Sequence, residues 1–172
     1  MITFENLNEI EIPGKTAVAL GNFDGVHLGH RKLISEMVDY GRENNLKTLV
    51  FTFSNHPRDL LPDATKKKNI LHRNEKSGII ESLGVDYLVN VPFTKEIMNM
   101  RAEEFITDIL IGKLNAKGAF CGFNYRFGLR ASGTPDLLRE FGEKLGFSVF
   151  EMEAFKVQGE PVSSSMIRTL IA

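Results

Sequence analysis

Five short apolar runs, separated by longer stretches with helical periodicity, constrain the fold of this chain more than any other feature. The runs lie at residues 16–21, 48–53, 86–91, 117–122 and 147–152. They are rich in β-branched and aromatic residues without strict alternation, which indicates strands buried on both faces. The helical stretches lie at 31–44, 74–83, 102–114 and 135–145. This alternation predicts an α/β fold: a doubly wound parallel sheet of about five strands with right-handed crossovers and helices on both faces.

Length and composition favour a single domain. The 172 residues are 42% hydrophobic and 25% charged, which suits one globular unit with a substantial core. No internal repeat, low-complexity segment or Pro/Gly/Ser-rich linker interrupts the pattern. We therefore expect one domain over residues 1–172.

Charge and cysteine content exclude several classes of protein. The formal net charge is −1 and the longest basic run is "KKK" at 66–68, so we expect no nucleic-acid partner. No stretch approaches 18 apolar residues and the first residues do not form a signal peptide, so we expect no membrane partner. The single cysteine, Cys121, permits no internal disulfide. Together these features predict a cytoplasmic protein.

The segment "GNFDGVHLGH", residues 21–30, follows the first predicted strand and precedes the first predicted helix. Its glycines, Gly21, Gly25 and Gly29, allow a close approach of the backbone, and such a turn presents free N–H groups to an anion. The dinucleotide fingerprint G-x-G-x-x-G and the P-loop are both absent, and "GKT" at 14–16 precedes the strand instead of following it. The segment therefore predicts phosphate binding by another arrangement.

Two histidines, His27 and His30, lie in this segment. A metal site would need carboxylate ligands as well, because the chain has one cysteine and only two other histidines, so we expect no metal bound by the protein. Either histidine alone is typical of a hydrogen-bonded loop residue. Together at a strand-to-helix turn they are better interpreted as donors to a phosphoryl group whose charge rises during displacement.

Two later segments suggest further contacts. In "GFNYRFG", residues 122–128, alternating aromatics are typical of a strand core, but the flanking glycines favour a loop that covers a planar ring, with Asn124 hydrogen bonding and Arg126 pairing with phosphate. In "SSSMIR", residues 163–168, serine capping of a helix explains one serine, whereas three serines and an arginine one turn later predict a second anion site.

These segments carry a family resemblance. "HLGH" resembles the H-x-G-H motif of the nucleotidylyltransferase superfamily, and "GNFDGVHLGH" resembles its form in the FAD synthetase (FMN adenylyltransferase) module of bacterial bifunctional riboflavin kinase/FAD synthetases. "FTFSNHP" (51–57), "FTKEIMNMRAEEFI" (93–106), "CGFNYRFGLRASG" (121–133) and "VSSSMIR" (162–168) resemble further segments of that family in the same order. Ser54 and Asn55 depart from its F-x-P-H-P pattern, and Ser165 replaces a more frequent threonine. The resemblance implies a Rossmann-like sheet of the nucleotidylyltransferase type.

The resemblance also implies an activity and a set of site residues. A phosphate oxygen of FMN would attack the α-phosphorus of ATP, giving FAD and pyrophosphate, with Mg²⁺ carried by ATP. The phosphate of FMN is largely ionised at pH 7, so no general base is required, and catalysis would rest on alignment and charge neutralisation. The implied catalytic residues are His27, His30, Ser164 and Arg168; the nucleotide-binding residues are Gly21, Asn22, Phe23, Asp24, Gly25, Gly29, Ser163 and Ser165; and the flavin-binding residues are His56, Pro57, Asn124, Tyr125, Arg126 and Phe127.

Several alternatives stay open at this point. Asn22 and Asp24 are equally compatible with Asx turns beside glycine, and "NHP" with an ordinary turn. Another nucleotidylyltransferase would share the histidine motif and the serine site but act on a different phosphate or on CTP, and a non-catalytic binding module would release no pyrophosphate. Only "TLIA" follows Arg168, so we expect this chain to lack the riboflavin kinase domain of full-length family members.

Overall fold

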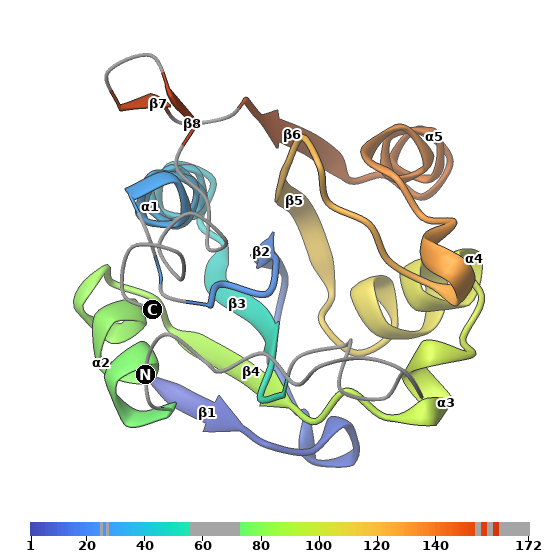
Figure 1. The fold of residues 1–172 in the computed structure, drawn as a ribbon, viewed down its shortest axis with the longest axis horizontal. Helices are drawn as coiled ribbons and strands as arrows, with labels where there is room; N and C mark the ends of the chain where they lie inside the picture. The colour runs from blue at the N-terminus through green and yellow to red at the C-terminus, as the bar shows by residue number, and fades with distance from the viewer. Residues whose placement is uncertain (25, 27, 56–72, 154–155, 158–159, 162–172) are drawn as a thin grey trace.

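The protein is built around a parallel sheet of six strands, seen in a computed structural model that describes residues 1–24, 26, 28–55, 73–153, 156–157 and 160–161 (Figure 1). The strands are β1 (Ile2–Phe4), β2 (Thr16–Leu20), β3 (Lys47–Phe53), β4 (Tyr87–Val91), β5 (Ala116–Gly122) and β6 (Ser148–Met152). Their order is β1-β4-β3-β2-β5-β6, and every neighbouring pair is parallel. Two short strands, β7 (Lys156–Val157) and β8 (Glu160–Pro161), form a separate antiparallel pair.

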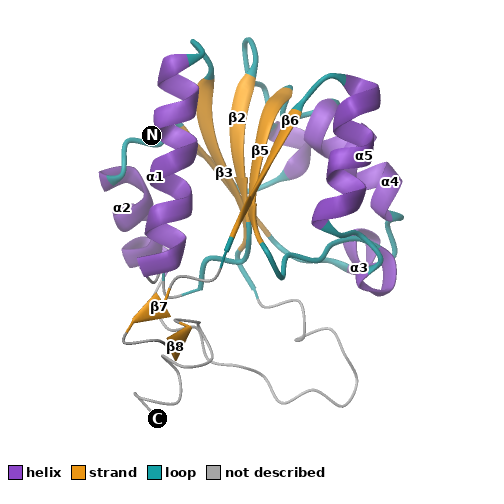
Figure 2. Cartoon of the chain, turned by 90° about the horizontal axis from the view of Figure 1, so that it is seen from above, coloured by secondary structure: helices purple, strands orange, loops and turns teal. Residues whose placement is uncertain are grey.

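Helices cover both faces of the sheet (Figure 2). On one side lie α1 (Leu28–Glu43) and α2 (Arg73–Ser82). On the other lie α3 (Lys95–Met98), α4 (Ala102–Glu104), the π-helical η3 (Phe105–Ile111) and α5 (Pro135–Leu145). Two short 3₁₀ turns, η1 (Leu7–Glu9) and η4 (Leu129–Ala131), lie in connecting segments.

Successive residues of β2 supply two separate hydrophobic cores. Ala17 and Ala19 pack with the buried residues of α1 and α2, whereas Val18 and Leu20 pack with those of α4, η3 and α5. All five residues of β2 are buried. This explains why the sequence "TAVAL" shows no alternation, because both faces of a central parallel strand are covered.

The predicted fold class is confirmed, and so are all five predicted strands to within a residue or two. The prediction was wrong in missing β1, an edge strand of three residues that pairs only with β4. Its side chains are exposed or half-buried, with Ile2 57% exposed, so no apolar run marks it in the sequence. The one-turn helix α3 was also missed.

Two helix boundaries differ from those predicted. Helix α1 begins at Leu28, so Gly29 and His30 lie in its first turn instead of in the preceding loop. Glycine is unfavourable in helix interiors but costs little in a first turn, which is why the sequence pattern placed the start too late. The predicted helix over 102–114 is α4 followed by η3, which ends at Ile111; hydrogen bonds from Gly112 N to Thr107 O (3.0 Å) and from Leu114 N to Ile109 O (2.9 Å) continue the wider π-type turn.

The sheet reverses its direction of growth beside β2. The chain adds β3 and then β4 on one side of β2, and β5 and then β6 on the other. Leu20 at the end of β2 pairs in register with Cys121 near the end of β5. The loops that follow β2 and β5 therefore emerge next to each other at the carboxyl edge, which is where parallel sheets of this kind bind ligands.

We predict that truncating the core side chain of Leu110 destabilises the fold without changing its topology. Leu110 lies on η3 and is fully buried against the sheet. Leu110→Ala should lower the free energy of unfolding by about 2–5 kcal/mol, the usual cost of a buried cavity of this size. Glu104 is exposed on the preceding helix α4, so the control variant Glu104→Ala should change the free energy of unfolding by less than about 0.5 kcal/mol. Urea denaturation followed by circular dichroism measures both values; equal midpoints for the two variants would contradict this packing.

Candidate active site

The loop after β2 contains backbone strain supported by packing. Phe23 (φ 49°) and Val26 (φ 39°) both adopt the left-handed conformation that non-glycine residues rarely enter, yet each is only 1% exposed. A Cβ atom on Gly21 would lie 2.9 Å from the ring of Phe23, so any side chain at this position would have to displace that buried ring. Strained backbone of this kind persists only where the surroundings enforce it, and it is concentrated at functional sites.

His30 lies at the start of α1, directly against this loop. Its ring meets that of Phe23 edge to face, with the ring centroids 5.2 Å apart and the planes at 84°. Arg31 donates from Nε to the carbonyl oxygen of Val26 over 3.2 Å, which closes the loop onto the helix. Asp24 is buried, at 7% exposed, and Asn22 is half-buried. The structure thus brings together six predicted residues: Gly21, Asn22, Phe23, Asp24, Gly29 and His30.

A buried lysine that the sequence analysis did not identify lies beneath this loop. The Nζ atom of Lys76 on α2 donates to the carbonyl oxygen of Asn22 (2.9 Å), to Oγ1 of Thr52 (3.0 Å) and to the carbonyl oxygen of Phe53 (3.3 Å). Thr52 in turn donates from Oγ1 to the carbonyl oxygen of Asn22 over 2.7 Å. An ammonium has three protons, and here each has an acceptor. The lysine therefore joins α2, the end of β3 and the loop after β2.

The environment of Lys76 disfavours its charge. The residue is 9% exposed, and among the described residues it forms no ion pair with a carboxylate. Burial lowers the pKa of its ammonium from 10.5 to about 8. The sequence did hold a signal for it: in "NEKSGIIESLG", Lys76 lies three and four residues before Ile79 and Ile80, on the apolar side of the helix. A lysine there is usually interpreted as a surface residue whose stem covers apolar neighbours.

The loop after β5 divides its aromatic residues between the core and the surface. Phe127 is 8% exposed and packs against Phe105 at 5.3 Å, and Tyr125 stacks on Phe127 at 5.6 Å. Burial raises the pKa of the Tyr125 hydroxyl. Phe123, directly after the end of β5, is instead 51% exposed. Packing thus explains much of the aromatic alternation at 125 and 127, as the strand-core alternative anticipated.

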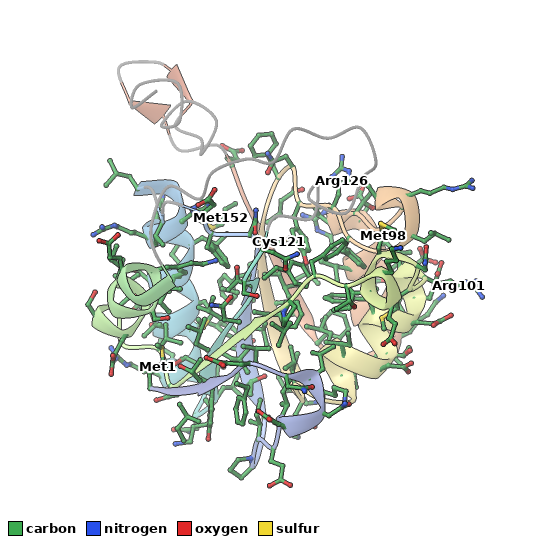
Figure 3. All side chains as sticks on the ribbon, turned by 60° about the horizontal axis from the view of Figure 1, so that its bottom comes forward. Met1, Met98, Arg101, Cys121, Arg126 and Met152 are labelled. Carbon is green, nitrogen blue, oxygen red and sulfur yellow. The ribbon has the colours of Figure 1, made fainter. Side chains whose placement is uncertain are left out.

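The polar residues of this loop are exposed. Asn124 and Arg126 both project from the core, and Arg126 donates from Nη1 to the carbonyl oxygen of Tyr125 over 2.9 Å. In Figure 3 the label of Arg126 lies above that of Cys121, a residue near the end of β5. Phe127 and Gly133 exchange backbone hydrogen bonds of 3.2 and 2.7 Å, which fix the base of the loop. Asn124 and Arg126 therefore have exposed side chains in a loop whose base is closed by these two hydrogen bonds.

Asn55, one of the departures from the family pattern, connects two strand ends. Its Nδ2 donates to the carbonyl oxygen of Phe93 (3.2 Å), and its Oδ1 accepts from the N–H of Phe93 (2.6 Å). The amide thus imitates a pair of backbone hydrogen bonds between the segments that follow β3 and β4. This contact gives the substitution a structural role immediately before His56.

The remaining predicted site residues lie outside the described part of the chain: Gly25, His27, His56, Pro57, Ser163, Ser164, Ser165 and Arg168. Within the described residues, no cluster of three or more His, Cys, Asp or Glu side chains is arranged to hold a metal ion. Of the helices that are described, none combines the length and apolar character needed to span a membrane.

Comparisons with known proteins identify the family of this chain. The family model for FAD synthetase matches residues 9–166. Bifunctional riboflavin kinase/FMN adenylyltransferases from Buchnera aphidicola (subsp. Schizaphis graminum) and Bacillus subtilis are 35% and 34% identical over 92% and 94% of this chain, and the enzyme of that name from Escherichia coli K12 is 32% identical over 90%. The chain spans about half the length of these relatives: 51%, 51% and 50% in the same order.

A solved structure also matches nearly the whole chain. A crystal structure described as a macrolide-efflux protein from Streptococcus pneumoniae superposes with a TM-score of 0.88 at 28% identity, over 99% of this chain and 55% of that one. The family match covers most of the chain and includes the strained loop, the helix that carries His30 and the loop after β5. This chain belongs to the FAD synthetase family.

Proposed function

We propose that this chain transfers AMP from ATP to FMN, giving FAD and pyrophosphate. The observation that carries the proposal is that the loop after β2 and the start of α1 lie at the reversal point of the sheet, in a chain that matches the FAD synthetase family over residues 9–166. The relatives named FMN adenylyltransferase support the choice of FMN over another phosphate. ATP and FMN are both substrates in this proposal, and Mg²⁺ enters with ATP.

The chemistry is a displacement at phosphorus. An oxygen of the FMN phosphate forms a bond to the α-phosphorus of ATP while the bond from that phosphorus to the bridging oxygen of the β-phosphate breaks, and pyrophosphate leaves with the electron pair. The attacking phosphate is already ionised, so the protein need not remove a proton. Its contribution is to align two anions and to stabilise the charge that develops between them.

Each part of the site has a proposed task. His27 and His30 donate hydrogen bonds to the reacting phosphates, and Gly21, Asn22, Phe23, Asp24, Gly25 and Gly29 form the nucleotide loop around them. Ser163, Ser164, Ser165 and Arg168 hold the phosphates of the leaving group. The flavin side consists of His56, Pro57, Asn124, Tyr125, Arg126 and Phe127. Exposure of Asn124 and Arg126 supports direct contact with the ligand for these two, and burial of Phe127 supports a role in shaping the loop.

The division of activities in the relatives follows from this assignment. They are named as bifunctional, and this chain spans about half their length. We propose that residues 1–172 form the adenylyltransferase module and that riboflavin kinase activity belongs to a separate C-terminal domain in full-length members of the family. The cytoplasm, which supplies ATP, is the expected compartment.

The first prediction about function tests the reaction itself. Incubation of the chain with FMN, ATP and Mg²⁺ should yield FAD and pyrophosphate in equal amounts, whereas riboflavin with the same additions should be recovered unchanged. Chromatographic separation of the flavins measures both outcomes, and omission of ATP is the control. Binding of FMN and ATP without pyrophosphate release would instead identify a non-catalytic module, and formation of FMN from riboflavin would refute the proposed division of activities.

The second prediction concerns His30, which lies against the strained loop. His30→Ala should lower turnover by roughly 10²–10³-fold, the scale of losing one donor to a developing oxyanion, while the affinity for each substrate changes less. His30→Gln keeps a donor and should retain more activity. Because His30 packs on Phe23, the melting temperature of each variant should be measured beside its kinetics. A correctly folded His30→Ala variant with near-normal turnover would leave His30 only a structural part of the loop.

The third prediction concerns the second anion site. Arg168→Ala removes a charge-assisted partner of the triphosphate, so the affinity for ATP should fall by ~1.5–3 kcal/mol while that for FMN stays nearly unchanged. Arg168→Lys keeps the charge and should lose less. Calorimetric titration with each ligand gives the two affinities separately, and an equal loss for both substrates would place Arg168 away from the nucleotide.

A further inference from the structure

We propose that Lys76 is a positioning residue for adenylyl transfer, whose buried ammonium holds the peptide between Asn22 and Phe23 in the orientation that the nucleotide loop requires. The inference rests on the proposed function and adds to it a residue on α2, outside every segment that carries the family resemblance. Its basis is the convergence of three elements on one nitrogen atom: the loop after β2, the end of β3 and α2.

The contacts fix one peptide plane. The carbonyl oxygen of Asn22 accepts from both Lys76 Nζ and Thr52 Oγ1, at 2.9 and 2.7 Å. A trans peptide is planar, so its N–H points opposite to its carbonyl. Holding the carbonyl of Asn22 toward Lys76 therefore fixes the direction of the N–H of Phe23, one of the backbone donors in the loop.

This peptide immediately precedes the strained part of the loop. Phe23 follows it in the left-handed conformation, and its ring in turn contacts His30. A conformation of this kind needs neighbours that exclude the alternatives. Packing of the Phe23 ring supplies the constraint on one side of the residue, and the hydrogen bonds on Asn22 supply it on the other. Lys76 is thereby connected through Asn22 and Phe23 to the histidine proposed to act on the phosphates.

Stability alone does not explain a charged group at this position. Among the described residues, the acceptors of the Lys76 ammonium are uncharged: two backbone carbonyl oxygens and one hydroxyl. The titratable residues next to these contacts in the sequence are Asp24, two residues after Asn22, and Glu75, adjacent to Lys76. Burial of an ammonium among uncharged acceptors destabilises the folded state, as the lowered pKa of Lys76 indicates. A positive charge beneath a loop that receives phosphates is, however, electrostatically favourable once the anion is bound.

The test replaces Lys76 with an apolar side chain of similar length. Lys76→Met should lower kcat for FAD formation at least ~30-fold, because the peptide between Asn22 and Phe23 is no longer held in the orientation that the reaction requires. The KM values for ATP and FMN should change several-fold less. At pH 7 its melting temperature should equal or exceed that of the wild type, because the cost of burying the charge is removed. The matched control is Lys47→Met: Lys47 is exposed at the opposite end of β3, and this variant should keep wild-type kinetics.

The pH dependence of stability provides a second readout with a defined sign. The folded-state pKa of Lys76 is about 8 against an ordinary value of 10.5, so between these values the unfolded chain binds more protons at this group than the folded chain does. This group therefore makes the wild type more stable as pH rises from 8 to 10.5. Any advantage in melting temperature that Lys76→Met has at pH 7 should shrink over that window.

A second pair of variants tests the same peptide without altering the lysine. Thr52→Val keeps the shape of the side chain but removes the hydroxyl that bridges Lys76 and Asn22, and it should lower kcat about 10-fold. Thr52→Ser restores the hydroxyl and should recover most of that loss. If Lys76→Met does not fold, this pair tests the positioning role instead: equal kcat values for Thr52→Val and Thr52→Ser would refute it.

The outcomes separate the two proposals. If the wild type forms FAD and the Lys76→Met and Thr52→Val variants turn over normally, the positioning role of Lys76 is refuted and the proposed function stands. A destabilised Lys76→Met variant whose folded fraction has normal kcat would likewise make Lys76 a purely structural residue. Failure of the wild type itself to form FAD would overturn both proposals.

Discussion

The arrangement of the whole site depends on the burial of β2 between two parallel neighbours. Its five residues are buried on both faces and pair with β3 on one side and β5 on the other. Every backbone polar group of such a strand is used within the sheet, so the chain can change direction only where the strand ends. The loop that follows must therefore leave at the carboxyl edge, beside the loop from β5, and it contains the left-handed residues Phe23 and Val26.

The loop is strained because several requirements meet in few residues. It must leave a central strand, bury Phe23 and Val26 against α1, and present its backbone to a ligand. Gly21 meets the need for close approach to the Phe23 ring, and Lys76 meets the need for a fixed carbonyl. Each residue taken alone slightly disfavours the folded state: Gly21 because glycine loses more backbone entropy on folding, and Lys76 because its charge is buried. Such local conflicts with stability are expected at functional sites.

The parts of the fold that were predictable from sequence are those with a strong local pattern. Strands β2 to β5 are largely buried on both faces, as their composition predicted, but the same prediction was wrong for β6, an edge strand whose residues are exposed or half-buried. Helix α5 carries its own start and stop signals: Thr134 caps it, Pro135 begins it and Gly146 ends it in the left-handed conformation. Strand β1 could not be predicted, because an exposed three-residue edge strand depends on its neighbour β4 and carries no pattern of its own. Residues 21–30 carry a local glycine and histidine spacing that could be identified from the sequence, and their role as a site stays a prediction.

Lys76 illustrates the opposite case. Its proposed role depends on Asn22 and Thr52, which lie 54 and 24 residues away in the sequence. The local pattern places Lys76 on the apolar side of its helix but does not reveal these partners. The aromatic residues after β5 were ambiguous for a related reason. Period-two spacing in "FNYRF" is compatible with both a buried strand and a ligand loop, and the tertiary contact of Phe127 with Phe105 decides how that ring is used.

The separation of the two hydrophobic cores has a consequence for how this module can change during evolution. Phe23 and Val26 anchor the loop after β2 in the core shared with α1 and α2, whereas Tyr125 and Phe127 anchor the loop after β5 in the core on the opposite face. The sheet stands between these two sets of side chains. Substitutions within one core can therefore adjust one loop while leaving the packing beneath the other intact. In terms of the proposed reaction, different substitutions in this one domain could change recognition of the nucleotide and recognition of its acceptor independently.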